Sequence, residues 1–386
     1  MNTLHALRKP GCQAPCASIR TRLLTLTRRA LTAVCLLGLA PLWPCASLAQ
    51  NPGEPAQADP YSPQAYKAAE RHKAVRIVAV GTGAQRSYIF APHEASAKDL
   101  PLVIFLHGWQ GTNPKNFGAL IDHLVLRGSV VLYPVYQRDA EDDPQTITSR
   151  ADKSLQAALE WLERERPGLV RQGKALYFGF SMGASMAVNL AARAAKGQLP
   201  QPYALLLSAP GDAHHVHRGA RSMVERSPAQ LPLSIPMILM TGSEDTTIGV
   251  PTAYAYWNAI CSQRRRNKTL VLFPAGTSGT QVIRSMHGMP GAPDPRYDLP
   301  DIDAPLPETV LLAQDAIASN PSLNVLDFHG HWKIITGAFD GLRDGQEPPQ
   351  WLFADSAQLR HLGAFSDGSP FPPAHLVWTC PARPGR

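Results

Sequence analysis

Short apolar runs alternate with amphipathic stretches from residue 75 onwards, and this alternation is the main structural signal in the sequence. Apolar runs are typical of buried strands, whereas an apolar residue at every third or fourth position is typical of a helix packed on a core. Predicted strands cover residues 75–80, 86–92, 102–108, 129–136, 175–180, 203–211, 236–242 and 269–276; predicted helices cover 116–128, 154–168, the stretch after Ser181, 251–261 and 332–342. The alternation predicts an α/β fold, a mostly parallel sheet of about eight strands with helices on both faces.

The pentapeptide Gly179-Phe180-Ser181-Met182-Gly183 lies between a predicted strand and an Ala-rich predicted helix. A serine at a sharp strand-to-helix turn presents its hydroxyl clear of the backbone, and the flanking glycines leave room for the turn. The following helix directs its free N–H groups at the place where a negative oxygen develops during acyl transfer. We therefore predict Ser181 as a nucleophile and the N–H of Met182 as an oxyanion donor. The alternative is a glycine-bounded turn with a surface serine.

Active groups of such sheets collect at the carboxyl ends of the strands, and this rule selects further residues. The turn His107-Gly108-Trp109-Gln110-Gly111 leaves a predicted strand, so the N–H of Trp109 is predicted as the second oxyanion donor. His107 itself is interpreted as structural. The acid that orients a histidine is predicted to be Asp245, with Glu244 and Asp212 as alternatives; a simple turn cap is the competing interpretation of Asp245.

The general base is predicted to be a histidine in the loop after the last strand. His287 follows the strand 269–276 most closely and is bracketed by glycine and proline. His329 and His331 are the alternatives, because they directly precede the final predicted helix.

The order of HGW, GFSMG, GSED and a later histidine resembles the α/β-hydrolase superfamily, and within it the exported esterase or dienelactone-hydrolase-like group. The resemblance covers about residues 75–345 and implies an eight-stranded sheet with a serine, acid and histidine triad in that chain order. Two features depart from the pattern: the stretch between the last strand and the final helix is long, and no short Gly-His turn follows that strand. A dienelactone hydrolase proper would carry a cysteine at the elbow, so its particular reaction is not implied.

These residues predict a serine hydrolase that cleaves carboxylic esters, of a small molecule or a polymer, through an acyl-enzyme. The chemistry needs no cofactor and no metal. A serine peptidase or an acyltransferase would use the same triad, and a catalytically silent hydrolase fold that binds an apolar ligand is the alternative from a different class.

Residues 1–49 are predicted to be a signal peptide that directs export to the periplasm or the medium. Arginines precede an apolar stretch at 30–43, and small residues lead to a cleavage site near Ala49. The apolar stretch is too short to span a bilayer, so no stable membrane anchor is expected. Residues 50–73 are predicted to form an N-terminal extension and residues 74–386 a single domain, with a Pro-rich tail from about 346.

Removal of this leader lowers the formal charge from +7 to +1, because residues 1–49 hold six basic residues and no acidic ones. Nucleic acid is therefore not an expected partner. The remaining basic cluster, Arg264-Arg265-Arg266 with Lys268, is interpreted as a solvated helix end. The run His214-His215-Val216-His217 is interpreted as a polar loop rather than a metal site, within an insertion at 213–230 that we expect to form part of a cap.

Four of the six cysteines leave with the leader, and Cys261 and Cys380 remain. One cysteine pair in an exported protein predicts one disulfide. It would join the helix 251–261 to the C-terminal tail, and two unpaired thiols are the alternative.

Overall fold

The structure, a computed structural model of the chain, describes residues 59–138, 142–197, 199–212, 222–262, 265, 267–299 and 322–381. The chain divides into two units, residues 1–57 and 58–386, and every described residue lies in the second. The predicted signal peptide with its cleavage site near Ala49, and the histidine run 214–217, lie outside the described residues. Among the helices that can be described, none has the length and apolar character needed to cross a membrane.

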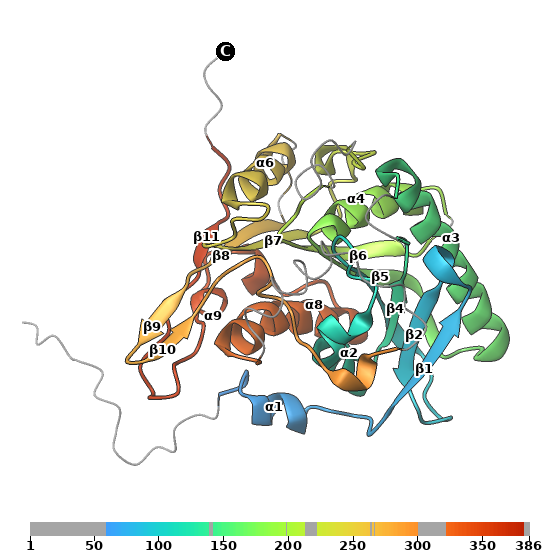
Figure 1. Ribbon diagram of the computed structural model, residues 1–386, viewed down its shortest axis with the longest axis horizontal. Helices are drawn as coiled ribbons and strands as arrows, with labels where there is room; N and C mark the ends of the chain where they lie inside the picture. Colours follow the sequence, from blue (N-terminus) through green and yellow to red (C-terminus); the bar gives the residue numbers. More distant parts are fainter. Residues whose placement is uncertain are drawn as a thin grey trace, which may run out of the picture. The chain divides into compact units, whose positions relative to one another are not determined.

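A nine-stranded sheet forms the centre of this unit, with strand order β1-β2-β4-β3-β5-β6-β7-β8-β11 (Figure 1). Neighbours from β4 to β8 are parallel, whereas β2 pairs antiparallel with β1 and β4, and β11 pairs antiparallel with β8. The strands are β1 (Val75–Val80), β2 (Ser87–Pro92), β3 (Leu100–Leu106), β4 (Val130–Pro134), β5 (Val170–Phe180), β6 (Gln201–Ser208), β7 (Met237–Gly242), β8 (Lys268–Phe273) and β11 (His375–Val377). The predicted α/β fold is confirmed, and β11 from the Pro-rich C-terminal segment is an addition to it.

Helices cover both faces of the sheet (Figure 1). Strand β3 shows why: Val103 and Phe105 pack into one core and Ile104 and Leu106 into the other, because successive side chains of a strand point to opposite faces. Helices α2 (Gly118–Leu126) and α8 (Lys333–Arg343) contribute to the first core, and α3 (Pro144–Glu165), α4 (Met182–Ala194) and α6 (Val250–Cys261) to the second. The shorter elements are α1 (Pro63–Ala68), α9 (Ala357–Arg360), the π-helix η6 (Leu326–Trp332), the hairpin β9 (Gly276–Ser278) and β10 (Gln281–Ile283), and the 3₁₀ turns η1 (Gly83–Gln85), η2 (Pro114–Phe117), η3 (Pro228–Gln230), η4 (Pro295–Tyr297) and η7 (Gln350–Phe353).

Helix α3 begins ten residues earlier than the predicted 154–168. The side chain of Asp143 caps it by accepting a hydrogen bond from the N–H of Gln145 at 3.1 Å, and Pro144 occupies the first helical position. The helix ends at Glu165, before Pro167. The cap at Asp143 and the proline at position 167 therefore define the two ends of α3, which apolar periodicity alone does not locate.

The interpretation of the basic cluster as a solvated helix end is wrong for Arg265, which is 1% exposed. Its guanidinium donates to the carbonyl oxygens of Pro232 at 2.7 Å and Leu231 at 3.1 Å, in the segment that leads into β7. Lys268 is also buried and donates to the carbonyl oxygen of Arg265. Burial lowers the pKa of Arg265 to about 10. The guanidinium thus serves as an internal donor for loop carbonyls.

The C-terminal segment is tied to the sheet at two places. Strand β11 pairs with β8, with His375 opposite Leu272. Cys261 at the end of α6 is disulfide-bonded to Cys380, with their Cα atoms 5.5 Å apart. The two cysteines that the sequence pairs are therefore joined in the structure.

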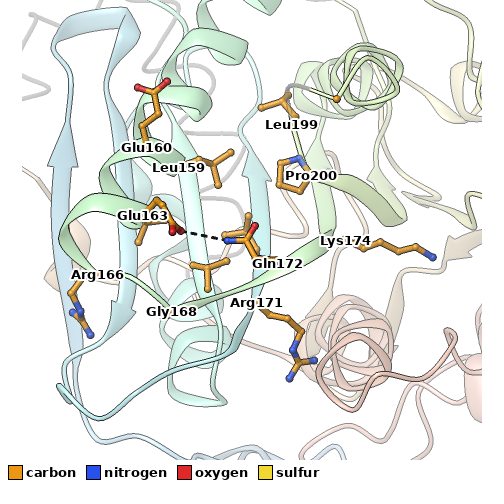
Figure 2. Close-up of a pocket in the computed structure, with 15 residues that line it drawn as sticks. Leu159, Glu160, Glu163, Arg166, Gly168, Arg171, Gln172, Lys174, Leu199 and Pro200 are labelled. Atoms are coloured by element: carbon orange, nitrogen blue, oxygen red, sulfur yellow. Dashed lines mark hydrogen bonds between the residues drawn. The ribbon is translucent and has the colours of Figure 1, made fainter.

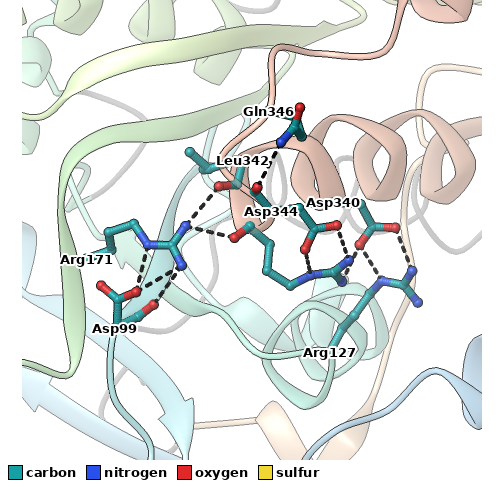
Figure 3. A network of polar contacts seen from close by, with 8 residues as sticks. Asp99, Arg127, Arg171, Asp340, Leu342, Asp344 and Gln346 are labelled. Atoms are coloured by element: carbon teal, nitrogen blue, oxygen red, sulfur yellow. Dashed lines mark hydrogen bonds and ion pairs between the residues drawn. The ribbon is translucent and has the colours of Figure 1, made fainter.

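A network of arginine and aspartate side chains fixes α8 near the amino edge of the sheet (Figure 3). Arg171 of β5 donates to the carbonyl oxygens of Leu342 at 3.1 Å and Arg343 at 2.8 Å, in the last turn of α8. Arg127 donates to both carboxylate oxygens of Asp340, at 2.9 and 2.6 Å. These contacts anchor the helix that follows the histidine-bearing η6.

Candidate active site

Ser181 lies between β5 and α4 with φ 54° and ψ −122°, a backbone conformation rare for any residue other than glycine. The turn is tight enough to exclude side chains at both flanking glycines. A Cβ atom on Gly179 would lie 2.2 Å from the carbonyl oxygen of Gly183, and one on Gly183 would lie 2.1 Å from that of Leu106. The backbone N–H of Ser181 donates to the carbonyl oxygen of Ser208 at 2.8 Å, which ties the turn to β6.

Three side chains from separate strand exits meet at this turn. Nε2 of His287 lies 3.0 Å from Oγ of Ser181, and Nδ1 of His287 lies 2.9 Å from Oδ2 of Asp245. Because a carboxylate only accepts, Nδ1 of His287 donates the hydrogen bond and Nε2 is left to accept from the serine hydroxyl. The three residues are 3%, 8% and 5% exposed, in the order Ser181, His287 and Asp245. The sequence predicted this group of three, and the structure brings them together.

Asp245 has a second set of contacts besides His287. Its Oδ1 accepts from the N–H groups of Thr247 and Ile248, each at 3.0 Å, and of Gly249 at 3.4 Å. Burial by itself raises the pKa of Asp245, but the hydrogen bond and charge of His287 and the backbone N–H groups outweigh it, so the pKa lies below its ordinary value. The carboxylate both caps its turn and remains ionised to orient the imidazole.

The alternative acids have other partners. Glu244 accepts from the N–H of Ser285 at 3.0 Å and pairs with Arg284. Asp212 accepts from the N–H of Met223 at 2.9 Å and so fastens the described end of the 213–230 insertion to the exit of β6. Within the described ranges, no three His, Cys, Asp or Glu side chains are grouped to hold a metal ion.

The alternative histidines lie on the π-helix η6 and also have other partners. His329 pairs with Asp59 at 3.1 Å, and Nε2 of His331 lies 3.0 Å from Oγ of Ser208. His107, expected to be structural, is fully buried and stacks on Tyr136 with ring centres 3.9 Å apart. Burial lowers the pKa of His107 to about 3, so it stays neutral. Of the histidines that the sequence offers as base, His287 is the one bonded to Ser181.

The two predicted oxyanion donors flank Ser181. Met182 is the first residue of α4, where backbone N–H groups have no acceptor within the helix. The turn at the exit of β3 lies against the serine from the other side, because a Cβ atom on Gly108 would lie 3.2 Å from Cβ of Ser181. Trp109 is the next residue of the same turn.

A cavity of about 680 Å³ opens at the amino edge of the sheet (Figure 2). It lies between the start of β5, the end of α3 and the residues before β6, and its lining includes Glu163, Arg166, Gln172, Lys174 and Pro200. Ser181 follows the opposite end of β5, about 23 Å away from Lys174 at the usual rise of about 3.3 Å per residue. This cavity is therefore separate from the site around Ser181.

The chain is similar to known proteins over part of its length. The sequence model of the dienelactone hydrolase family matches residues 86–200, a segment that includes Ser181 but ends before Asp245 and His287. Among solved structures, the chain is similar to a candidate dienelactone hydrolase from Klebsiella pneumoniae subsp. pneumoniae MGH 78578, at 18% identity and a TM-score of 0.38, covering 52% of this chain and 86% of that one. No curated protein is significantly similar to the sequence.

The chain thus has the sheet order and the serine elbow of an α/β-hydrolase fold. Over residues 86–200 it is similar to the dienelactone hydrolase family, and the match supports a hydrolase function. The elbow residue of this chain is a serine, Ser181.

Proposed function

We propose that this protein is an exported serine hydrolase that cleaves carboxylic esters through an acyl-enzyme intermediate. The observation that supports the proposal most strongly is the continuous hydrogen-bonded chain from Ser181 through His287 to Asp245, with distances of 3.0 and 2.9 Å. This arrangement activates a weak nucleophile: the imidazole accepts the hydroxyl proton, and the carboxylate stabilises the imidazolium that forms.

In the first half-reaction, Oγ of Ser181 attacks the ester carbonyl while Nε2 of His287 takes its proton. His287 then returns the proton to the leaving alcohol as the tetrahedral intermediate collapses to the acyl-enzyme. In the second half-reaction, His287 removes a proton from water as the water attacks the acyl group, and it returns this proton to Oγ of Ser181 as the acid leaves. Asp245 keeps the same hydrogen bond throughout, because its pKa is held low by His287 and by backbone N–H groups.

The negative oxygen of each tetrahedral intermediate would be bound by the N–H groups of Trp109 and Met182. A donor of this kind contributes about 3 kcal/mol to transition-state stabilisation, because it is already aimed at the place where charge develops. The chemistry proceeds with side chains and backbone groups, so we propose no cofactor.

The substrate is proposed to be a carboxylic ester of a small molecule or a polymer. A serine peptidase and an acyltransferase would share the first half-reaction and differ in the leaving group or the acceptor. A silent hydrolase fold would instead bind an apolar ligand without acyl transfer.

Export is proposed from the basic and apolar pattern of residues 1–49. Expression of the full-length gene followed by N-terminal sequencing of the secreted or periplasmic protein tests it. A mature N-terminus at Gln50 is expected, and retention of the intact leader in the cytoplasm would contradict it.

A fluorophosphonate probe and a substrate panel test the activity. The wild-type protein is expected to react with the probe and to hydrolyse p-nitrophenyl esters, whereas Ser181→Ala does neither. Faster cleavage of peptide amides than of esters would identify a peptidase. An acyltransferase would instead transfer the acyl group to an added alcohol in preference to water. Absence of labelling and turnover in folded wild-type protein would favour the binder.

A further inference from the structure

Side chains at the exit of β4 hold the backbone of the turn that leaves β3. Tyr133 and Tyr136 donate their hydroxyls to carbonyl oxygens of this turn, at Gly111 and His107 respectively. Oε1 of Gln137 accepts from the backbone N–H of Gln110 at 2.6 Å, and Gln137 is only 2% exposed. The two strands are parallel neighbours, so their exits lie side by side.

Two of the contacts in this turn fix the peptide planes on either side of Trp109. The carbonyl oxygen of Gly108 accepts from Nδ1 of His107 at 2.7 Å. Because a trans peptide is planar, the N–H of Trp109 must point away from that carbonyl. The next plane is fixed at the N–H of Gln110, which donates to Gln137. The direction of the Trp109 N–H therefore depends on one contact before it and one after it.

The contact from Gln137 is made to a strained residue. Gln110 has φ 57°, in the left-handed region that residues with a side chain rarely adopt. Nε2 of Gln137 and both polar side-chain atoms of Gln110 are buried with no hydrogen-bond partner among the described residues. Buried polar atoms without partners destabilise the folded state, so stability alone is a poor explanation for an amide at position 137.

We propose that Gln137 is a positioning residue for the reaction: it holds Gln110 in its left-handed conformation and thereby keeps the N–H of Trp109 aimed at the developing oxyanion. It acts through the backbone and does not touch the substrate. The inference rests on the proposed function, because the orientation of the Trp109 N–H matters only if a negative oxygen forms beside Ser181.

The test compares Gln137→Leu with Gln172→Leu, a matched change at an exposed position on the opposite edge of the sheet. With a p-nitrophenyl ester, Gln137→Leu is expected to lower kcat by about 10-fold to 100-fold and to leave KM within about twofold of the wild-type value. This decrease in kcat does not exceed the decrease caused by removing a whole oxyanion donor. Its affinity for a trifluoromethyl ketone, which forms a tetrahedral oxyanion on the serine, is expected to fall by the same factor. Gln172→Leu is expected to match the wild type.

Gln137→Glu supplies a second readout that a purely structural role would not move. A buried protonated carboxyl keeps the acceptor oxygen for Gln110, so activity is restored relative to Gln137→Leu at the acid end of the working range. As pH rises and the new carboxyl ionises, its negative charge opposes the oxyanion, and kcat is expected to fall along a limb that is absent from the wild-type profile.

Two results would overturn the inference while the wild-type enzyme remains active. One is an unchanged kcat and ketone affinity in folded Gln137→Leu. The other is a lower melting temperature in Gln137→Leu with an unchanged kcat per folded molecule, together with a pH profile of Gln137→Glu that has no added limb. That pattern would mean that Gln137 only stabilises the fold. Failure of the proposed function itself is distinguishable, because the wild-type protein would then show neither ester turnover nor probe labelling.

Discussion

His287 and Ser181 are 106 positions apart in the chain, yet Nε2 of the histidine lies 3.0 Å from the serine hydroxyl oxygen. The contact joins the carboxyl end of β5 to the loop that follows the β9–β10 hairpin. His329 and His331, the alternative bases that the sequence offers, contact Asp59 and Ser208 instead.

This difference between the histidines gives the first prediction. His287→Ala should reduce kcat/KM for an ester by at least about 10³-fold, because the hydroxyl loses its proton acceptor. His329→Ala and His331→Ala should keep kcat within about 10-fold of the wild type once corrected for folded protein. Fluorophosphonate labelling of the three variants measures the effect, and loss of labelling in His331→Ala but not His287→Ala would reassign the base.

Asp245→Asn should lower kcat by about 10³-fold to 10⁴-fold with little change in KM, because the amide leaves the imidazole in the wrong tautomer. The change keeps an oxygen that can accept from the N–H of Ile248, so the turn should remain folded. Glu244→Gln is the matched control, since Glu244 bonds Ser285 rather than His287. Equal losses in the two variants would remove the distinction between the acids.

The low pKa of Asp245 also predicts a pH dependence of stability. A carboxyl whose folded pKa lies below its unfolded value of about 3.9 stabilises the protein above that pH, and the contribution disappears as pH falls through the folded pKa. The free energy of unfolding of the wild type should therefore exceed that of Asp245→Asn near pH 6, and the gap should close below about pH 4. Urea unfolding across this range measures it; a gap that widens with acid would contradict the sign.

Gly183→Ala should prevent the elbow from forming, because its new Cβ would lie 2.1 Å from the carbonyl oxygen of Leu106. The clash is with backbone, so no side-chain rotation relieves it. Loss of both stability and activity is expected. Gly330→Ala is a milder comparison, since its nearest contact is the Phe273 ring at 3.2 Å. Melting temperatures of the two variants that rank in the opposite order would contradict the packing described for the elbow.

Arg265→Ala should destabilise the protein by about 2 to 4 kcal/mol, because carbonyl oxygens before β7 lose a buried donor. The site around Ser181 is not in contact with this guanidinium, so kcat per folded molecule should be unchanged. Arg226→Ala, at an exposed arginine, should change stability by less than about 0.5 kcal/mol. Chemical denaturation of both variants checks the prediction, and equal stabilities would contradict an internal role for Arg265.

Much of the fold was predictable because each buried strand carries its own signal in consecutive apolar residues. The serine elbow was equally predictable, since the glycines that the turn requires lie two residues before and after Ser181 in the chain. The three-residue strand β11 was not predicted, because it is too short for a periodic pattern and depends on pairing with β8.

The remaining site features depend on distant packing. The strand-end rule placed acids and histidines at the correct edge, but the choice of His287 over His331 depends on a loop path that contains no periodic signal. The pattern at 129–136 predicted a strand, but it did not predict the hydrogen bonds from Tyr133 and Tyr136 to the neighbouring turn. Those contacts exist because β4 lies next to β3, an order that local sequence does not encode.

Mass-spectrometric mapping of the fluorophosphonate adduct tests the central claim most directly. Digestion of the labelled wild-type protein should place one phosphonyl group on Ser181, and the same peptide from His287→Ala should be unmodified. An adduct on a different residue, or undiminished modification of Ser181 without His287, would contradict the account.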